Sequence, residues 1–417
     1  MKFALICCIL VFMATFPASA TDPSIVRLAQ DPACVQALNW IDGSGAWVTE
    51  QQIRITETPA PEYGEKRRAE LLQSILADMG YKARIDETGN VVVERIGMQA
   101  DRVVLVAAHL DTVFTAGTDV QVRRDGKRLL APGISDNGAG LAALVAVARA
   151  YVESSLRTDA TIVFAADVGE EGEGNLRGIR ALVDAYGSRL AAVIAIDGPS
   201  TAHITTQGIA SRRFEFTVSG PGGHSWSDFG MPNPITALSR GIVQFSAIRL
   251  PESPRSTFNF GVIEGGNSVN SIPGDASVKV DLRSENEAEL GRLETSLRDA
   301  MQSGFAAEIA ARRSAAGTLQ MKVRSLGSRP AGKLPDSSPL LQTVRDVDRF
   351  LQNSSRIESS STDANLPLSM KIPAVSLGGG GKGGGAHTLA EWYDATGREL
   401  GIKRLFLVTA SLAGLQQ

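Results

Sequence analysis

The chain has 417 residues, which is enough for two domains of ordinary size. Its 43% hydrophobic and 21% charged residues are typical of a globular protein. The net charge of −3 argues against nucleic acid or an anionic membrane surface as the main partner.

Residues 1–20 are predicted to be a signal peptide. Lys2 supplies a minimal basic region, Phe3–Phe16 is an apolar run too short to span a bilayer comfortably, and Ala18–Ala20 is a small-x-small cleavage site. No later stretch has the pattern of a membrane span. We therefore expect a mature protein that begins near Thr21, is exported to the periplasm or the extracellular medium, and has no membrane contact.

The three cysteines are Cys7, Cys8 and Cys34. A lipoprotein signal that uses Cys7 or Cys8 is disfavoured, because the apolar run continues beyond both. After cleavage only Cys34 remains, so no intrachain disulfide can form. We expect Cys34 to be a small, partly buried residue without a functional role.

The first half of the mature chain alternates helical patterns with short apolar runs, which are typical of strands buried on both faces of a sheet. The predicted elements are a helix over Pro61–Gly80, strands over Asn90–Glu94 and Val103–Ala108, a helix over Gly138–Tyr151, a strand over Thr161–Ala166, a helix over Asn175–Tyr186 and a strand over Ala192–Ile196. This order predicts an α/β fold with a mostly parallel central sheet and helices on both faces.

The pattern changes near Ser211 and returns near Leu334. Between them the predicted elements are strands over Arg213–Val218, Thr257–Ile263, Ser277–Leu282 and Leu319–Ser325, and helices over Asn233–Ile248 and Glu285–Arg312. Their β-α-β-β-α-β order predicts a ferredoxin-like domain. Beyond it follow a helix, a buried strand and a helix, over Ser338–Gln352, Ala374–Leu377 and Gly397–Leu415. We therefore expect a smaller domain of residues 211–326 inserted into a larger domain of residues 21–210 and 327–417.

Five side chains of the metal-binding type are spread over the larger predicted domain: His109, Asp136, Glu171, Asp197 and His387. Three of them closely follow the carboxyl ends of predicted buried strands, where open α/β sheets bind ligands. Imidazoles and carboxylates are the ligands of Zn²⁺, and they also accept Co²⁺ or Mn²⁺. One bridging carboxylate with two further ligands for each ion makes a two-metal hydrolytic site, so the sequence predicts a di-zinc hydrolase.

Glu170 and Glu171 are adjacent acids in a glycine-rich segment. Such a pair alone is usually a solvated turn. Beside His109-Leu-Asp111 and Ser135-Asp136-Asn137 it fits a division of labour, in which one carboxylate binds metal and the other takes a proton from water.

These motifs together resemble the di-zinc metallopeptidase family that includes tripeptidase T, carnosinase-type dipeptidases, glutamate carboxypeptidase and aminoacylase, over nearly the whole mature chain. The resemblance implies that Asp136 bridges both ions and is followed by a cis peptide bond. It implies that His109 and Asp197 complete one metal site and Glu171 and His387 the other. It further implies that Asp111 orients the ring of His109 and that Glu170 is the general base.

The resemblance also implies that the larger domain is the catalytic domain and that the inserted domain is a lid whose residues contact substrate. His224 would polarise the scissile carbonyl, often from the partner subunit of a lid-mediated homodimer, Arg283 would bind a substrate carboxylate, and Asn270 would contact substrate. Gly384 and Gly385 end a glycine run whose N–H groups suit a terminal carboxylate. The simpler alternatives are an exposed histidine, a lid salt bridge and a flexible hinge.

Asp197 precedes Gly198-Pro199, so an ordinary Asx turn is the alternative to a metal ligand. The resembled family tends to have Asp there in amino- and dipeptidases and Glu in carboxypeptidases and acylases. We therefore expect an exopeptidase for di- and tripeptides. The alternatives are an amidohydrolase or carboxypeptidase acting on N-acyl amino acids or peptides, and an inactive binding scaffold, which the complete ligand set and Glu170 disfavour. His203 is given no role.

Overall fold

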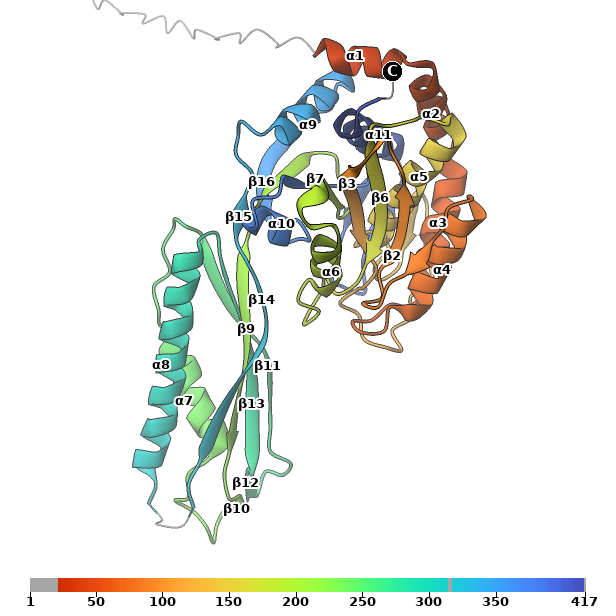
Figure 1. The fold of residues 1–417 in the computed structure, drawn as a ribbon. Helices are drawn as coiled ribbons and strands as arrows, with labels where there is room; N and C mark the ends of the chain where they lie inside the picture. Colours follow the sequence, from red (N-terminus) through yellow and green to blue (C-terminus); the bar gives the residue numbers. More distant parts are fainter. Residues whose placement is uncertain (1–21, 314–316, 416–417) are drawn as a thin grey trace, which may run out of the picture.

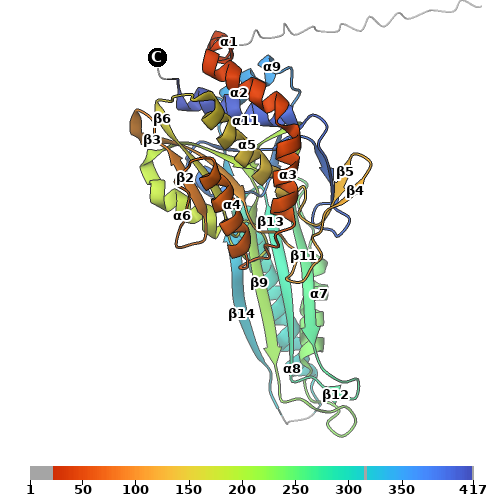
Figure 2. The same cartoon turned by 90° about the vertical axis from the view of Figure 1, so that its right-hand side faces the viewer.

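The computed structural model describes residues 22–313 and 317–415, so the predicted signal peptide lies outside the described residues. The chain forms two bodies that are joined by two segments of the chain, and the second body extends away from the first (Figures 1 and 2). Within the described ranges we find no helix with the length and apolar character needed to cross a bilayer.

The larger body is built on a nine-stranded sheet of the described residues, with the order β1-β2-β6-β3-β7-β17-β8-β15 and β16 beside β8. Its strands are β1 (Arg84–Ile85), β2 (Val91–Arg95), β3 (Gln99–His109), β6 (Ala160–Asp167), β7 (Leu190–Ile196), β8 (His203–Gly208), β15 (Gly332–Lys333), β16 (Arg356–Ser360) and β17 (Ala374–Leu377). The neighbours β6, β3, β7 and β17 run parallel, whereas β1, β2 and β15 pair antiparallel. The prediction of a mostly parallel central sheet is confirmed.

Helices cover both faces of this sheet (Figure 1). They are α1 (Pro23–Gln30), α2 (Pro32–Gly43), α3 (Gly45–Thr56), α4 (Lys66–Asp78), α5 (Gly138–Ser154), α6 (Arg177–Tyr186), α9 (Pro339–Phe350), α10 (Asn365–Ser369) and α11 (Arg398–Ala413). All eight residues of β6 are buried, and α5 and α11 pack on the sheet through β3. Buried strands between helix layers fix the position of the strand ends, which is where the predicted ligands lie.

The predicted bounds differ from the structure at one helix in particular. The helix expected from Pro61 begins at Lys66, because Pro61 instead forms a bridge with Thr112 in a parallel sense. That bridge places the segment before α4 beside the loop that follows His109.

The smaller body has the predicted β-α-β-β-α-β order, and the ferredoxin-like prediction is confirmed. Its elements are β9 (Ala210–Ser219), α7 (Pro234–Ser246), β11 (Ser256–Gly265), β13 (Asp275–Ser284), α8 (Glu287–Ala311) and β14 (Gln320–Arg329). The antiparallel sheet has the order β11-β13-β9-β14, and α7 and α8 pack side by side against it. The last strand continues past Ser325 to Arg329 through a register shift at Gly327, so it ends next to the catalytic domain.

A small sheet carries the segment around His387. It has the order β18-β19-β5-β4, formed by Lys382–Gly384, Trp392–Asp394, Arg128–Leu130 and Arg123–Asp125. Strands of three residues show no alternation that a sequence pattern could reveal. Because β18 and β19 flank His387, this hairpin fixes the position of its ring.

Candidate metal centre

The five predicted ligands converge at the carboxyl edge of the central sheet. His109 is the last residue of β3, Asp197 directly follows β7, and Glu171 lies in the loop after β6. Asp136 lies just before α5, and His387 follows β18. Each ligand is thus held by a different element of the catalytic domain.

Asp136 joins two groups of three ligands. Its Oδ1 lies 3.3 Å from His109 Nε2, which is also 3.9 Å from Asp197 Oδ1. Its Oδ2 lies 3.1 Å from His387 Nε2, which is 2.9 Å from Glu171 Oε1. In each group the donor atoms lie within 4.8 Å of one another. This is the arrangement of two ion sites that share one carboxylate.

The donor atoms lack the partners that buried polar atoms need. Within residues 22–313 and 317–415, neither His109 Nε2 nor Asp136 Oδ1 has a hydrogen-bond partner, although both atoms are buried. Buried polar atoms without a partner are rare in folded proteins and call for an ion or water. Imidazole nitrogen facing carboxylate oxygen is a donor set that fits Zn²⁺.

The carboxylates around His109 and His387 also favour a cation at this centre. Burial lowers the pKa of His109, but the carboxylates of Asp136 and Asp197 outweigh burial and raise it well above its usual range. Hydrogen bonds to Asp136 and then Glu171 raise the pKa of His387 to about 10. Because metal binding requires neutral imidazole, a cation at this centre must displace these protons.

Asp111 supports the centre differently from the expected role. His109 Nδ1 lies 3.1 Å from the main-chain oxygen of Asp111 and 3.8 Å from its carboxylate, so the carbonyl is the nearer group that orients the ring. The carboxylate instead accepts hydrogen bonds from the N–H groups of Gly169 (2.9 Å), Glu170 (3.1 Å) and Glu171 (2.7 Å). Asp111 therefore holds the loop that carries Glu170 and Glu171.

Glu391 holds the loop of Asp136 in a comparable way, and it was not among the predicted site residues. This buried carboxylate accepts hydrogen bonds from Gly133 N–H (2.8 Å), from Ser135 N–H (2.8 Å) and hydroxyl (2.7 Å), and from Asp136 N–H (2.8 Å). The peptide bond after Asp136 is cis, as the family resemblance implies. Glu391 follows His387 by four residues in an unremarkable run, so no pattern identified it.

Glu170 is buried beside the ligands. It lies within reach of His109 and Glu171, and its Oε1 forms an ion pair of 2.7 Å with Arg329. Burial raises the pKa of Glu170 above its ordinary range, and the Arg329 guanidinium opposes that rise. Such a carboxylate, close to the ligands but held by a cation, is suited to accept a proton from water. Arg329 was also missed from the sequence.

Two further acids, Asp167 and Asp363, lie buried behind Glu170. Burial raises the pKa of Asp167 to about 7, and burial together with Asp167 raises the pKa of Asp363 well above its usual range. The pair therefore retains a proton near neutral pH. Neither acid was predicted as part of the site, because a lone Asp at a strand end is not distinctive.

A cavity of about 310 Å³ lies between the metal centre and the lid. Glu171 and His387 line it from the catalytic domain, and Arg283, Lys279 and Asn259 line it from the lid. Arg283 Nε donates a hydrogen bond of 2.6 Å to Asp281, while the Arg283 side chain remains 41% exposed. The structure thus brings the predicted substrate-binding arginine to the ligands of one ion.

His224 and Asn270 do not join the metal centre of their own chain. They lie on and beside β10 (Gly223–His224) and β12 (Ser271–Ile272), which pair with each other at the end of the lid farthest from the catalytic domain (Figures 1 and 2). Ser225 N–H donates a hydrogen bond of 3.0 Å to the Asn270 carbonyl. The lid is elongated, so the end attached to the catalytic domain lies near the predicted ligands and the tip does not.

Part of the glycine run is used by the fold itself. Gly379 N–H donates to Gly198 O (2.8 Å), and Gly380 N–H donates to Pro199 O. Gly384 pairs with Trp392 in the hairpin, and Gly385 adopts the left-handed backbone region, with φ of 69°, two residues before His387. Gly384 and Gly385 therefore shape the His387 loop, and their contact with a substrate carboxylate stays a prediction.

Cys34 and His203 are the two remaining residues that were singled out in the sequence, and neither was assigned a functional role. Cys34 is buried, and burial raises the pKa of its thiol to about 12. His203 lies 3.8 Å from Glu358, and burial lowers its pKa although the Glu358 carboxylate opposes that shift.

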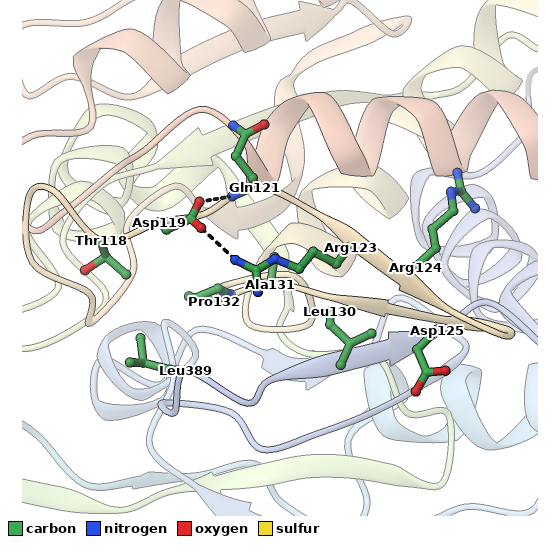
Figure 3. A pocket seen from close by; sticks show the side chains of 10 residues that line it. All are labelled: Thr118, Asp119, Gln121, Arg123, Arg124, Asp125, Leu130, Ala131, Pro132 and Leu389. Atoms are coloured by element: carbon green, nitrogen blue, oxygen red, sulfur yellow. Dashed lines mark hydrogen bonds and ion pairs between the residues drawn. The ribbon is translucent and has the colours of Figure 1, made fainter.

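A larger cavity, of about 620 Å³, lies beside β4 and β5 (Figure 3). Its charged side chains include Asp119 and Arg123, which pair with each other at 2.9 Å. Leu389 links its rim to the His387 loop. None of the predicted site residues lines this cavity, so the chemistry belongs to the smaller one.

Known proteins resemble this chain in sequence and in fold. A protein of Mycobacterium tuberculosis assigned as the succinyl-diaminopimelate desuccinylase DapE is 28% identical over 240 residues, and the match covers 55% of this chain and 65% of that protein. The structure of aminopeptidase PepT from Bacillus cereus matches with a TM-score of 0.66 and 18% identity, over 89% of this chain and 99% of that one. The dipeptidase Dug1p of Saccharomyces cerevisiae matches with a TM-score of 0.73 and 13% identity, over 91% and 98%.

The chain thus spans just under two thirds of that curated relative, and the two structures establish the fold. The model of Peptidase family M20/M25/M40 matches residues 105–410, which include all five ligands, Glu170 and the whole lid. This chain belongs to Peptidase family M20/M25/M40.

Proposed function

We propose that this protein is a zinc-dependent exopeptidase that hydrolyses di- and tripeptides and acts outside the cytoplasm. The observation that carries the proposal is the pair of ligand triads that share Asp136, with Glu170 beside them. The predicted signal peptide supports export, and Asp197 favours the short-peptide branch of the family.

His109 and Asp197 would hold one ion, Glu171 and His387 the other, and Asp136 both. Two such ions, when bound, lower the pKa of a water molecule from ~15.7 to about 7, which makes hydroxide available at neutral pH. Co²⁺ or Mn²⁺ would be accepted by the same donor set.

Glu170 would move the proton. Its carboxylate lies beside His109 and Glu171, so it can accept the proton of a water molecule at the centre and return it to the leaving amine. Asp111 fixes the backbone of its loop through three hydrogen bonds. Such preorganisation avoids a reorganisation cost during the reaction.

Arg283 would orient the substrate. Its Nε donates to Asp281, and its terminal nitrogens can present a planar pair of donors to a substrate carboxylate in the cavity. A free carboxylate two bonds from the scissile amide is what a dipeptide or an N-acyl amino acid offers.

A homodimer would complete the site. His224 lies at the lid tip, too far from its own metal centre to contact substrate there, so it can act only from a second copy or after a large lid movement. The edge strand β11 leaves Val262 and Ile263 exposed, and the neighbouring α7 leaves Val243 71% exposed. An open edge with apolar side chains suits pairing with a second copy.

The substrate class is tested with the mature, zinc-loaded protein and its Glu170→Gln variant. The panel is Ala-Ala, Ala-Ala-Ala, N-acetyl-Ala-Ala, Ala-Ala-amide and N-acetyl-Met, with products followed by mass spectrometry. Turnover that requires a free amino terminus and is lost in Glu170→Gln supports the proposal.

The second candidate is an amidohydrolase or carboxypeptidase for N-acylated amino acids or peptides. The desuccinylase assignment of the curated relative favours it. Hydrolysis of N-acetyl-Met alone would select an acylase, and cleavage of N-acetyl-Ala-Ala without the amide would select a carboxypeptidase. A metal-loaded protein that turns over no member would favour a binding scaffold.

A further inference from the structure

Arg329 is the last residue of the final lid strand, and its side chain is 5% exposed. It pairs with Ser211 of β9 in the lid sheet, so its backbone belongs to the lid. Its guanidinium reaches into the catalytic domain. There Nη1 lies 2.7 Å from Glu170 Oε1 and 3.0 Å from Ser361 Oγ, and Nη2 donates to the main-chain oxygen of Glu170.

The two bonds to Glu170 have a geometric consequence. One guanidinium binds the side chain and the main chain of the same residue, which limits both the backbone and the rotamer of that glutamate. Among the side chains of residues 22–313 and 317–415, we find no donor to the Glu170 carboxylate other than Arg329. A lysine can replace the charge but cannot reproduce the planar fork.

Arg329 is one of several lid residues that contact the loop after β6, which carries Glu170 and Glu171. Arg213 on β9 donates to the Gly172 carbonyl, and Lys279 on β13 pairs with Glu173 at 2.7 Å. Beside Arg329, the N–H of Ser328 donates to Asn175 Oδ1 at 2.9 Å. The loop is therefore held by Asp111 from inside and by three lid strands from outside.

We propose that Arg329 is a positioning residue that aims the Glu170 carboxylate at the metal centre and links its position to the orientation of the lid. The proposal rests on the proposed role of Glu170 as general base. Arg329 keeps Oε1 occupied from the lid side, which leaves the other oxygen to face the reacting water.

The test compares Arg329→Lys with Arg404→Lys. Arg404 forms an equally buried, two-pronged ion pair with Asp348 (2.7 and 2.8 Å) on the catalytic domain, away from the ligands. We expect Arg329→Lys to lower kcat about 10- to 100-fold with KM within about threefold and with two zinc ions per chain retained. Arg404→Lys should lower the melting temperature but leave kcat unchanged.

A second readout does not depend on turnover. Hydrogen exchange of the segment 168–176 in the metal-free protein should be faster in Arg329→Lys and unchanged in Arg404→Lys. If the wild type hydrolyses no substrate of the panel, the proposed function is refuted. Faster exchange in Arg329→Lys would still support the positioning role in that case.

Three results would overturn the proposal: unchanged kcat and exchange in Arg329→Lys, a fall in kcat matched by loss of zinc, or an equal fall in Arg404→Lys. If Arg329→Lys does not fold, Ser361→Ala removes only the hydroxyl that Nη1 contacts. A smaller loss of kcat with the same retention of zinc then supports the proposal, and an unchanged kcat contradicts it.

Discussion

The two regions that carry predicted catalytic residues are organised in opposite ways. At the sheet edge His109 is 1% exposed and Glu170 4%, and buried carboxylates hold the loops that carry the ligands. At the lid tip His224 is exposed, and its Nδ1 accepts N–H groups of Trp226 and Ser227 at 3.2 and 3.3 Å. The edge is preorganised by the fold, whereas the tip presents its histidine outward.

The difference has a physical cause. Parallel strands between two helix layers end at one edge, so any polar residue there is fixed by the packing of the whole domain. A ferredoxin-like lid attached by one end of its sheet places its other end in solvent. Function at the tip therefore requires a second copy or a movement, and function at the edge does not.

The largest effect is expected from Asp136→Asn, which removes the charge shared by both triads at nearly constant size. We expect catalytic efficiency to fall at least ~10⁴-fold, with zinc content reduced from two ions per chain. Elemental analysis and turnover measure both. A variant that retains two ions and full turnover would show that the edge is not organised around Asp136.

Glu170→Gln separates ion binding from proton transfer at the same edge. The loss in kcat should be about 10²- to 10⁴-fold, because the amide cannot accept the proton from water. Zinc content should remain at two ions per chain. Turnover close to that of the wild type would assign the base to another residue.

His224→Ala probes the tip. Loss of one donor to a developing oxyanion costs about 10²- to 10³-fold in kcat. If the tip acts on a second copy, mixing His224→Ala with Asp136→Asn should restore about one quarter of wild-type activity, because half of the random dimers then contain one intact site. No recovery in re-equilibrated mixtures, together with a monomeric mass by light scattering, would refute the cross-subunit role.

Glu391→Gln tests the anchoring of the edge. The amide can still accept from Ser135 and Asp136, but its NH₂ group would face the Gly133 N–H, so the loop loses one bond and gains a repulsion. Supporting residues of metal ligands typically contribute 10- to 100-fold in affinity or activity, and we expect a loss in that range. Zinc affinity measured by chelator competition should fall with it; unaltered affinity and activity would make Glu391 dispensable.

The smallest effect concerns Asp167 and Asp363. Burial raises the pKa of Asp167 from 3.8 to about 7, so the folded state binds more protons than the unfolded state between these values. The free energy of unfolding of the metal-free protein should therefore fall as pH rises from about 4 to about 7. Asp363→Asn can donate to the Asp167 carboxylate without a shared proton, so this slope should flatten in thermal melts; identical slopes would contradict the account.

Local sequence patterns predicted the buried strands, the candidate ligands and the inserted lid domain. Fully apolar runs such as Val103–Ala108 identified the buried strands. Three of the five predicted ligands, His109, Glu171 and Asp197, were found at or shortly after the ends of such runs. The lid was predicted because its alternating strands contrast with those runs.

Features that depend on distant contacts were not predictable in this way. Glu391 and Asp136 are 255 residues apart and Arg329 and Glu170 are 159 apart, so only the fold brings each pair together. Helices α1 to α3 lay outside the periodic patterns, although Asp31 before Pro32 is a usual helix start. The distance of His224 from the predicted ligands likewise follows from the orientation of the lid and not from its own sequence motif.

The most direct test of the two-ion centre is a calorimetric titration of the metal-free protein with Zn²⁺. The shared position of Asp136 between two ligand triads predicts two ions bound per chain in the wild type and fewer than two in Asp136→Asn. Saturation of the wild type by a single ion, or two ions bound equally well without the Asp136 carboxylate, would contradict the account.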